Sequence, residues 1–158
     1  MATAHLIFGY LGVGKTTFAR ALAERVQGVL LSEDEWYLRL YADGARDHLD
    51  LEWSQRLIGV LDDLWPEILR RGIDVVLDFG FWGRERREAA RRRAAEVGGE
   101  AELYWVTCDE AVARGRVLRR NSDPGASFQI LGNAYDELRA KFEPLGPDEQ
   151  YELIDTTR

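Results

Sequence analysis

The sequence predicts an α/β fold in which a five-stranded parallel sheet is covered by helices on both faces. Short apolar runs alternate with helical patterns along the whole 158-residue chain, and this alternation is typical of βαβ units. A glycine-rich loop joins the first apolar run to the first helical pattern, which predicts a strand–loop–helix unit at the start of the sheet. The length fits one domain, over residues 1–158, that is large enough to bury a core.

Five apolar runs supply the strands. Glycines at 28, 72 and 98–99 separate three of these runs from the helical pattern that precedes each. The strands are expected at about 4–9, 29–31, 73–78, 101–107 and 151–154. Because parallel sheets bind ligands at the carboxyl ends of their strands, polar residues that follow these runs are the candidates for a site.

Helical periodicity fills the intervals between the strands. The helices are expected at about 15–26, 34–42, 50–71, 84–97, 109–120 and 130–142. Ser32 is expected to cap the second helix, with Glu35 completing a capping box, and Asp109 or Thr107 to cap the fifth. Pro66 lies inside the third pattern and is expected to kink that helix or to mark a second helix start.

Composition narrows the class of protein. The apolar fraction of 46% is that of a folded globular chain, and no run of 18 apolar residues predicts a membrane span. Cys108 is the single cysteine, so no internal disulfide can form, and we expect a cytoplasmic protein. The net charge of −7 argues against a general nucleic-acid coat. Either a monomer or a homodimer is compatible with these properties.

The loop after the first strand carries the strongest motif in the chain. Gly9-Tyr10-Leu11-Gly12-Val13-Gly14-Lys15-Thr16-Thr17 matches G-x-x-x-x-G-K-[ST], the phosphate-binding P-loop. Its glycines let backbone N–H groups point inward, and the following helix adds its positive dipole end. Lys15 is expected to reach the β- and γ-phosphates of ATP, and Thr16 to ligate Mg²⁺. The expected nucleotide-binding residues in this loop are Gly9, Gly12, Val13, Gly14, Lys15, Thr16 and Thr17.

Two acidic residues follow neighbouring strands. Asp34 comes just after the second strand, where a carboxylate could act as general base toward an acceptor hydroxyl; the alternative is an acidic first helical turn that the dipole favours. Asp78 ends the third strand, where it could hold Mg²⁺ or contact substrate. Its alternative role is to cap the loop that follows.

Two arginines predict a lid over the phosphates. Arg116 and Arg120 are four residues apart, so they share a helix face that leads into the turn-rich segment 121–127. Phosphoryl transfer needs positive charge near the transferred group, and an arginine-bearing lid at about 115–130 would supply it while excluding water. The alternative is an exposed basic helix face. In the lid interpretation, both arginines are catalytic and contact the nucleotide.

Aromatic residues gather at the same strand ends as the proposed base. Trp36, Phe79 and Trp82 are candidates to line an acceptor pocket for a ring-bearing or apolar molecule. The alternative is that they belong to the core, as most aromatic residues do.

With these residues assembled, the chain resembles the small zeta-toxin and chloramphenicol-phosphotransferase-like P-loop kinases. That group includes the kinase domain of polynucleotide kinases and many AAA-type ATP-binding proteins. The resemblance covers nearly the whole chain and implies a three-layer P-loop kinase fold with strand order 2-3-1-4-5. The residues that match the group's motifs are Gly9, Gly14, Lys15, Thr16, Asp34, Asp78, Arg116 and Arg120. It also implies that Arg84 and Arg87, a basic pair that follows the third strand in many members, bind substrate.

One departure bears on the acceptor. Polynucleotide kinases carry an arginine shortly after the base, but here Trp36 and Tyr37 intervene and Arg39 comes later. This departure and the acidic net charge weaken a nucleic-acid 5′-hydroxyl as the acceptor.

The expected function is therefore an ATP- and Mg²⁺-dependent transfer of a phosphoryl group to a hydroxyl of a small molecule. An antibiotic, a sugar-like metabolite or a nucleoside would fit as the acceptor. The alternatives are a nucleotide, nucleoside or polynucleotide 5′-hydroxyl kinase, a toxin-like kinase of a sugar nucleotide, and an ATPase without an acceptor. The catalytic residues would be Asp34, Lys15, Arg116 and Arg120.

Overall fold

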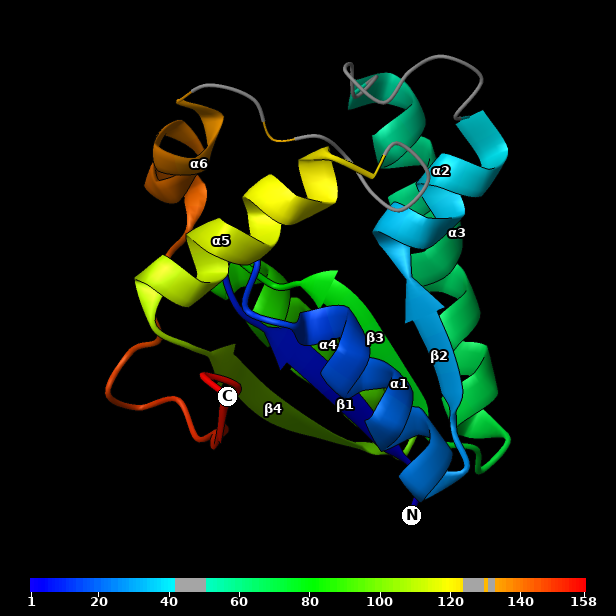
Figure 1. Cartoon of the computed structure of the whole chain (residues 1–158). Helices are drawn as coiled ribbons and strands as arrows, with labels where there is room; N and C mark the ends of the chain where they lie inside the picture. Colours follow the sequence, from blue (N-terminus) through cyan, green and yellow to red (C-terminus); the bar gives the residue numbers. More distant parts are fainter. Residues whose placement is uncertain (42–50, 124–129, 131–132) are drawn as a thin grey trace.

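A computed structural model of the chain describes residues 1–41, 51–123, 130 and 133–158. Its five strands form one sheet in which every neighbouring pair is parallel, in the order β2-β3-β1-β4-β5, so the predicted order is confirmed (Figure 1). The strands are β1 (Thr3–Phe8), β2 (Val29–Ser32), β3 (Val75–Gly80), β4 (Glu100–Thr107) and β5 (Glu152–Asp155).

Helices connect the strands at each crossover. They are α1 (Lys15–Val26), α2 (Glu33–Tyr41), α3 (Leu51–Arg70), α4 (Arg84–Glu96), α5 (Glu110–Asn121) and the short α6 (Ala134–Glu137), which continues into a 3₁₀ turn, η1 (Leu138–Lys141). Within the described residues, no helix has the length and apolar character that crossing a membrane requires.

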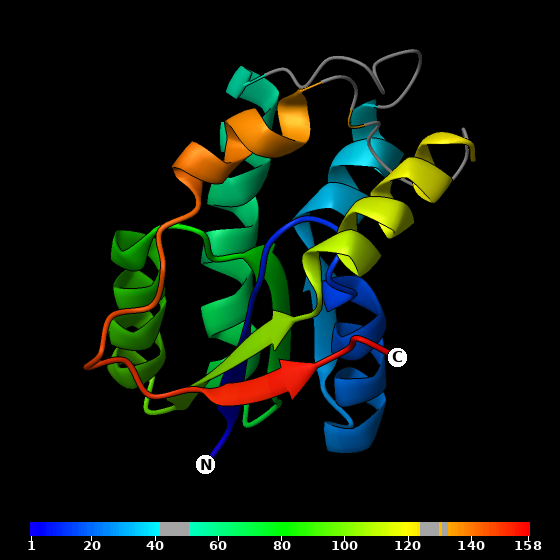
Figure 2. The ribbon, with the colours of Figure 1, turned by 60° about the vertical axis from the view of Figure 1, so that its left-hand side comes forward.

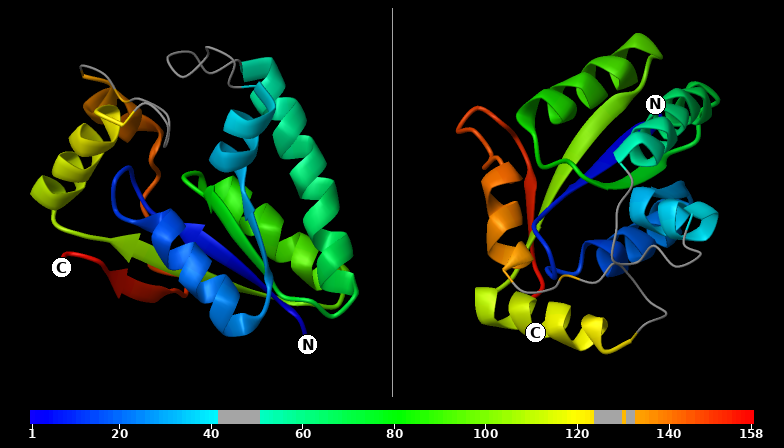
Figure 3. Two further views of the ribbon diagram at one scale, coloured as in Figure 1. Left: turned by 45° about the vertical axis from the view of Figure 1, so that its right-hand side comes forward. Right: turned by 90° about the horizontal axis from the view of Figure 1, so that it is seen from above.

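The sheet lies between two helical layers. Seen from above, α3 and α4 cover one face and α1 and α5 the other (Figure 3). Alternate residues of β1 enter the two layers, as a strand buried on both faces requires. Ile7 belongs to a core with Ala19 of α1, whereas Leu6 belongs to a core with Leu61 of α3 and Ala94 of α4. The three-layer α/β fold predicted from the sequence is therefore confirmed.

Pro66 does not begin a second helix. α3 runs from Leu51 to Arg70 with Pro66 inside it. Proline has no N–H to donate to the carbonyl four residues earlier, which belongs to Asp62. The side chain of Arg93 on α4 supplies the missing donor, with Nη1 2.8 Å from the Asp62 carbonyl oxygen. The helix therefore tolerates the proline because a neighbouring helix satisfies the orphaned acceptor.

The last helix is much shorter than the expected span of 130–142. Its first turn begins after Asn133, whose carbonyl accepts the N–H groups of Asp136 and Glu137, and a 3₁₀ turn follows. Ile130 lies outside the helix because the Asn121 side chain binds both its N–H (2.9 Å) and its carbonyl (2.7 Å). Side-chain bonding by Asn121 thus satisfies the backbone polar groups of Ile130.

One further prediction about a helix end is tested by the structure, and others concern residues outside the described ranges. Asp109 occupies the N-cap of α5, but its side chain makes no capping hydrogen bond. The expected end of the second helix at 42 and start of the third at 50 lie outside the described residues. Most of the predicted lid loop, 124–129, also lies outside them.

Candidate active site

The P-loop spans residues 9–14 between β1 and α1, at the carboxyl end of β1. Gly12 and Gly14 adopt positive φ angles of 76° and 91°, a backbone region that side chains with a Cβ rarely enter. Gly9 has a different requirement, because a Cβ there would lie 2.5 Å from the Val106 carbonyl oxygen of β4. A Cβ on Gly12 would lie 2.4 Å from the Ala113 carbonyl oxygen of α5. The glycine spacing of the motif is thus imposed by both conformation and packing.

Lys15 and Thr16 open α1 directly after the loop. The Lys15 ammonium donates to the Tyr10 carbonyl oxygen at 2.7 Å, across the loop. Burial lowers the pKa of Lys15, while the charges of Asp78 and Asp34 oppose that shift. Thr16 donates its hydroxyl to Oδ2 of Asp78 at 2.8 Å. The end of β3 is therefore joined to the start of α1 by an oxygen pair of the kind that Mg²⁺ prefers.

Asp34 faces the same group of charges from the first turn of α2. Its pKa is raised, first by burial of the carboxyl among protein atoms and then by the negative charge of Asp78. Lys15 and Arg120 act in the opposite sense. The residue nevertheless keeps a solvent-accessible surface, so an incoming molecule can reach it. The structure thus brings together Asp34, Asp78, Lys15 and Arg120, four residues that the sequence had singled out on four different elements.

Arg116 and Arg120 have different surroundings although they share α5. Burial lowers the pKa of Arg120, and the charge of Asp34 opposes the shift, so this guanidinium lies within electrostatic range of that carboxylate. Arg116 instead donates to the Thr156 carbonyl (2.6 Å) and hydroxyl (3.0 Å), just after β5. A longer contact of 3.5 Å reaches the Gly12 carbonyl oxygen. The two arginines, expected to act jointly, therefore differ in surroundings: Arg120 lies within electrostatic range of Asp34 and Arg116 lies beside the P-loop.

Thr156 is a loop contact that sequence inspection missed. Its hydroxyl donates to the Val13 carbonyl oxygen at 2.5 Å, and its N–H to the Thr107 carbonyl oxygen at 2.9 Å. It therefore ties the ends of β4 and β5 to the P-loop. No local pattern distinguishes this threonine from its neighbour Thr157, because the contact depends on a partner 143 residues away.

The three aromatic candidates for an acceptor pocket do not form one wall. Phe79 is only 7% exposed and belongs to the core on the α3–α4 side, and Trp36 packs half-buried against the same core. Trp82 lies on the P-loop, with its indole N–H 2.9 Å from the Gly9 carbonyl oxygen. The core alternative therefore fits Phe79, while Trp82 contacts the loop rather than a space beside Asp34.

Arg84 and Arg87 do not fit the substrate role implied by the resemblance. Arg87 has no exposed surface, and its guanidinium donates twice to the Glu149 carboxylate at 2.8 Å. Arg84 bonds both oxygens of Asp148 (2.9 and 2.5 Å) and also Glu88. Both arginines thus hold the segment 142–150, which passes α4 before entering β5 (Figure 2). Their guanidinium groups are therefore engaged in contacts that hold tertiary structure.

Glu33, the neighbour of Asp34, is paired with Arg86 of α4. The Arg86 guanidinium also lies over the Phe79 and Phe81 rings, 5.2 and 5.6 Å from their centroids. Burial raises the pKa of Glu33 from 4.5 to about 7, although the hydrogen bond and charge of Arg86 oppose the shift. The pair joins the helix that carries the proposed base to the helix that follows β3.

The raised pKa of Glu33 predicts a pH-dependent stability. The folded state binds this proton more tightly than the unfolded state, so the stability from Glu33 is complete below about pH 4.5 and is lost as the pH rises to about 7. We expect a Glu33→Gln variant to lose less unfolding free energy than the wild type between pH 5 and pH 8, as measured by urea denaturation. Equal losses in the two proteins would contradict this assignment.

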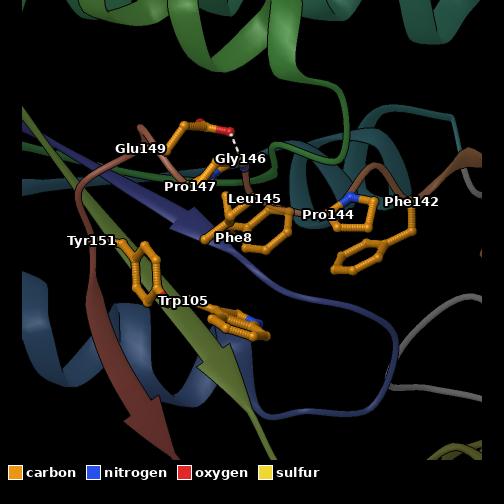
Figure 4. Close-up of a pocket in the computed structure, with 9 residues that line it drawn as sticks. All are labelled: Phe8, Trp105, Phe142, Pro144, Leu145, Gly146, Pro147, Glu149 and Tyr151. Atoms are coloured by element: carbon orange, nitrogen blue, oxygen red, sulfur yellow. Dashed lines mark hydrogen bonds between the residues drawn. The ribbon is translucent and has the colours of Figure 1, made fainter.

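Two cavities lie apart from this cluster of charges. One, of about 240 Å³, is lined by aromatic and proline side chains between β1, β4 and the segment 142–147 (Figure 4). A second, of about 200 Å³, lies between the outer side of the P-loop, α5 and α6, and shares Trp105 and Phe142 with the first. Neither is lined by Lys15, Asp34 or Asp78. In the described parts of the chain, no group of three or more His, Cys, Asp or Glu side chains forms a metal site.

The fold and the glycine-rich loop define the class: this is a P-loop domain with a kinase-like sheet order. A family model described as an AAA domain matches residues 5–145, and the chain belongs to that family. No curated protein matches the sequence.

Solved structures with low sequence identity share the fold. A protein from Chloroflexus aurantiacus J-10-fl, proposed to be a kinase, is 22% identical with a TM-score of 0.75, and the match covers 99% of this chain and 89% of that one. A gluconokinase from Sinorhizobium meliloti 1021 is 16% identical with a TM-score of 0.66, covering 99% and 83%. Kti12 of Chaetomium thermophilum, solved with ADP-AlF₃, is 19% identical with a TM-score of 0.68, covering 98% and 88%.

Proposed function

We propose that this protein is an ATP- and Mg²⁺-dependent phosphotransferase that moves the γ-phosphoryl group to a hydroxyl of a small molecule. The observation that carries the proposal is the meeting of a solvent-accessible carboxylate, Asp34, with Lys15 and Arg120 beside the P-loop. A bare ATPase needs no such base on the acceptor side. A phosphotransferase needs one within reach of the hydroxyl that receives the phosphoryl group.

The residues present fit a magnesium nucleotide. The P-loop backbone and Lys15 would hold the β- and γ-phosphates. The oxygens of Thr16 and Asp78, 2.8 Å apart, would hold Mg²⁺ directly or through water. When bound, the ion would neutralise charge on the phosphate oxygens. The likeness to Kti12, which was solved with ADP-AlF₃, supports this use of the loop.

In this proposal, Asp34 accepts the proton of the acceptor hydroxyl as the oxygen attacks the γ-phosphorus and the bond to ADP breaks. Its raised pKa makes it a stronger base than an aspartate with the ordinary pKa, while the charges of Lys15 and Arg120 partly oppose that shift. Lys15 and Arg120 also place positive charge where the transferred group spreads its negative charge. Most of the rate enhancement would come from this positioning and electrostatic stabilisation.

The acceptor class we favour is a small polyhydroxyl compound or an antibiotic. The likeness to a gluconokinase supports a sugar-like acceptor, and membership in the zeta-toxin and chloramphenicol-phosphotransferase-like group is part of this proposal. A nucleic-acid 5′-hydroxyl is less favoured because the net charge of −7 opposes a polyanion.

The test is ADP formation with ATP and Mg²⁺ across a panel of acceptors. The panel holds sugars and sugar acids, aminoglycosides, chloramphenicol-like compounds, nucleosides and a 5′-hydroxyl oligonucleotide. ADP formation that depends on one class, with transfer of the γ-phosphoryl group seen by mass spectrometry, identifies the acceptor. Turnover that is the same with and without every acceptor would instead support an ATPase.

Replacement of Lys15 tests the nucleotide site itself. We expect Lys15→Met to weaken Mg·ATP binding about 10- to 100-fold, because the ammonium makes charge-assisted hydrogen bonds to phosphate. Isothermal titration calorimetry measures the change. Lys141, the other lysine, lies in the 3₁₀ turn η1, so Lys141→Met serves as the matched control and is expected to bind as the wild type does.

A further inference from the structure

The loop after β3 reaches back to the P-loop through one side chain. Trp82 donates its indole N–H to the Gly9 carbonyl oxygen at 2.9 Å, over a separation of 73 residues. Its ring also stacks on Tyr10, with the centroids 5.3 Å apart and the planes 29° from parallel. Gly9 and Tyr10 are joined by the first peptide bond of the P-loop. Trp82 therefore contacts both of them, Gly9 through its indole N–H and Tyr10 through its ring.

The backbone before Trp82 is strained in a way that sets its position. Gly80 and Phe81 both have positive φ angles, of 73° and 49°. Phe81 is not a glycine, and a side chain in this region persists only where its surroundings fix it. The Phe81 ring is 1% exposed, and Gly80 lies against the indole, since a Cβ there would be 3.3 Å from its nitrogen.

Arg87 on α4 binds the backbone of the same loop. Its Nη1 donates to the Phe81 carbonyl oxygen at 2.9 Å and approaches that of Trp82 at 3.4 Å, while Glu149 fixes its other donors. The Trp82 carbonyl also accepts the N–H of Glu143 at 2.8 Å. The strained turn is thus clamped by a buried ion pair and by a backbone hydrogen bond, which together leave the indole little freedom.

The contact between Trp82 and Tyr10 lies next to Lys15, the lysine proposed to bind phosphate. Lys15 donates to the carbonyl of Tyr10, the residue on which the indole stacks. The Tyr10 hydroxyl is also held, because it donates to the Tyr135 carbonyl oxygen. The peptide before Tyr10 is therefore held by the indole N–H, and the Tyr10 ring is held at one face and at its hydroxyl, so the Tyr10 carbonyl has few orientations left in which to meet Lys15.

We propose that Trp82 is a positioning residue of the nucleotide site, which sets the start of the P-loop from the loop after β3. This inference rests on the proposed nucleotide site but not on the identity of the acceptor. It assigns Trp82 a role toward the nucleotide, in place of the acceptor contact expected from the sequence. Loss of its N–H is expected to weaken Mg·ADP binding about three- to tenfold, the range for one partly buried hydrogen bond.

The test compares Trp82→Phe with Trp105→Phe by titration with Mg·ADP. Trp105 is also half-buried and lies in the same part of the core as Phe142, but within the described residues no hydrogen bond or ring contact joins it to Gly9 or Tyr10. We expect weaker binding in Trp82→Phe and wild-type binding in Trp105→Phe, with both variants folded by circular dichroism. Saturation with Mg·ADP is also expected to change tryptophan emission in Trp105→Phe more than in Trp82→Phe.

A second variant keeps the experiment decisive if Trp82→Phe does not fold. Gly80→Ala retains the indole but presses a methyl group against its nitrogen, and it is expected to weaken Mg·ADP binding in the same direction. Wild-type affinity in a folded Trp82→Phe, or in Gly80→Ala, would overturn the positioning role while leaving the nucleotide site intact. A wild-type protein that binds no nucleotide would overturn the proposed function and the positioning role together.

Discussion

Asp34→Asn is expected to lower acceptor-dependent turnover by about 10²- to 10⁴-fold while leaving Mg·ATP binding within about threefold of the wild type. The amide keeps the shape of the side chain but cannot take up the proton of the acceptor hydroxyl. The residues proposed to hold the nucleotide belong to the P-loop and α1, and the hydrogen bonds of Lys15 and Thr16 do not involve Asp34. Steady-state kinetics with the acceptor found in the panel, together with calorimetric titration of Mg·ATP, would separate the two effects.

Glu35 supplies the matched control for this substitution. It lies in the same first turn of α2, and its one ion pair within the described residues is a long surface contact, 3.6 Å, with Arg20. Glu35→Gln removes one acidic charge from the helix N-terminus, so it measures the dipole effect alone, which is small at an exposed site. A similar loss of turnover in both variants would support the dipole alternative and remove the assignment of Asp34 as base.

The pH profile gives a second check on the same residue. Burial and Asp78 raise the pKa of Asp34, and the base must be ionised to act. Wild-type kcat/KM is therefore expected to rise with pH through a value above the usual range for an aspartate.

The site residues that could be predicted from sequence are those whose role depends on local geometry. The P-loop glycines, Lys15 and Thr16 follow from one loop conformation before one helix. Asp34 and Asp78 follow from the rule that strand ends share one edge of the sheet. These four side chains could therefore be proposed with little knowledge of long-range packing, whereas the strand order was implied by the family resemblance.

The arginines show where sequence reasoning fails. Arg84, Arg86 and Arg87 lie within one turn of α4, and a charge count treats them alike. Their partners are Asp148, Glu33 and Glu149, which come from segments more than 50 residues away. Because the partners decide whether a guanidinium is structural or free, the roles of these residues depend on contacts that no local pattern contains.

Pro66 illustrates the same limit for secondary structure. Taken locally, a proline in a helical pattern predicts a break. The Arg93 guanidinium on α4 supplies the hydrogen bond that the proline lacks, so α3 is assigned as one helix. The helix therefore continues past Pro66 because Arg93, 31 residues from Asp62 in the sequence, donates to the Asp62 carbonyl.

Arg87→Met is expected to destabilise the fold by about 3–5 kcal/mol, a large part of the total stability of a domain this size. The substitution keeps much of the side-chain volume but leaves the Glu149 carboxylate buried without its cation, since that side chain is only 2% exposed. It also removes donors from the Phe81 and Glu143 carbonyls. Urea unfolding of the wild type and the variant at neutral pH measures the loss.

Two further variants show whether the ion pair carries this effect. Arg84→Met breaks the neighbouring but exposed pair with Asp148 and is expected to change stability little. The double variant Arg87→Met/Glu149→Met replaces both charges by apolar groups and is expected to recover much of the loss, because an unpaired buried charge costs more than an absent pair. A loss in Arg87→Met no larger than in Arg84→Met would show that Glu149 is not confined as the structure indicates.

The stability lost in Arg87→Met is expected to depend on pH in a defined direction. Arg87, through its hydrogen bond, lowers the pKa of Glu149 below 4.5 in the folded protein. The stability from this pair is therefore present above the unfolded pKa and is lost as the pH falls through the lower folded value. In Arg87→Met the unpaired Glu149 carboxylate can take up a proton. The difference in unfolding free energy between the variant and the wild type should therefore shrink as the pH falls from neutral to about pH 4. A difference that stays constant over this range would assign the destabilisation to lost packing and carbonyl contacts, and not to the charge of Glu149.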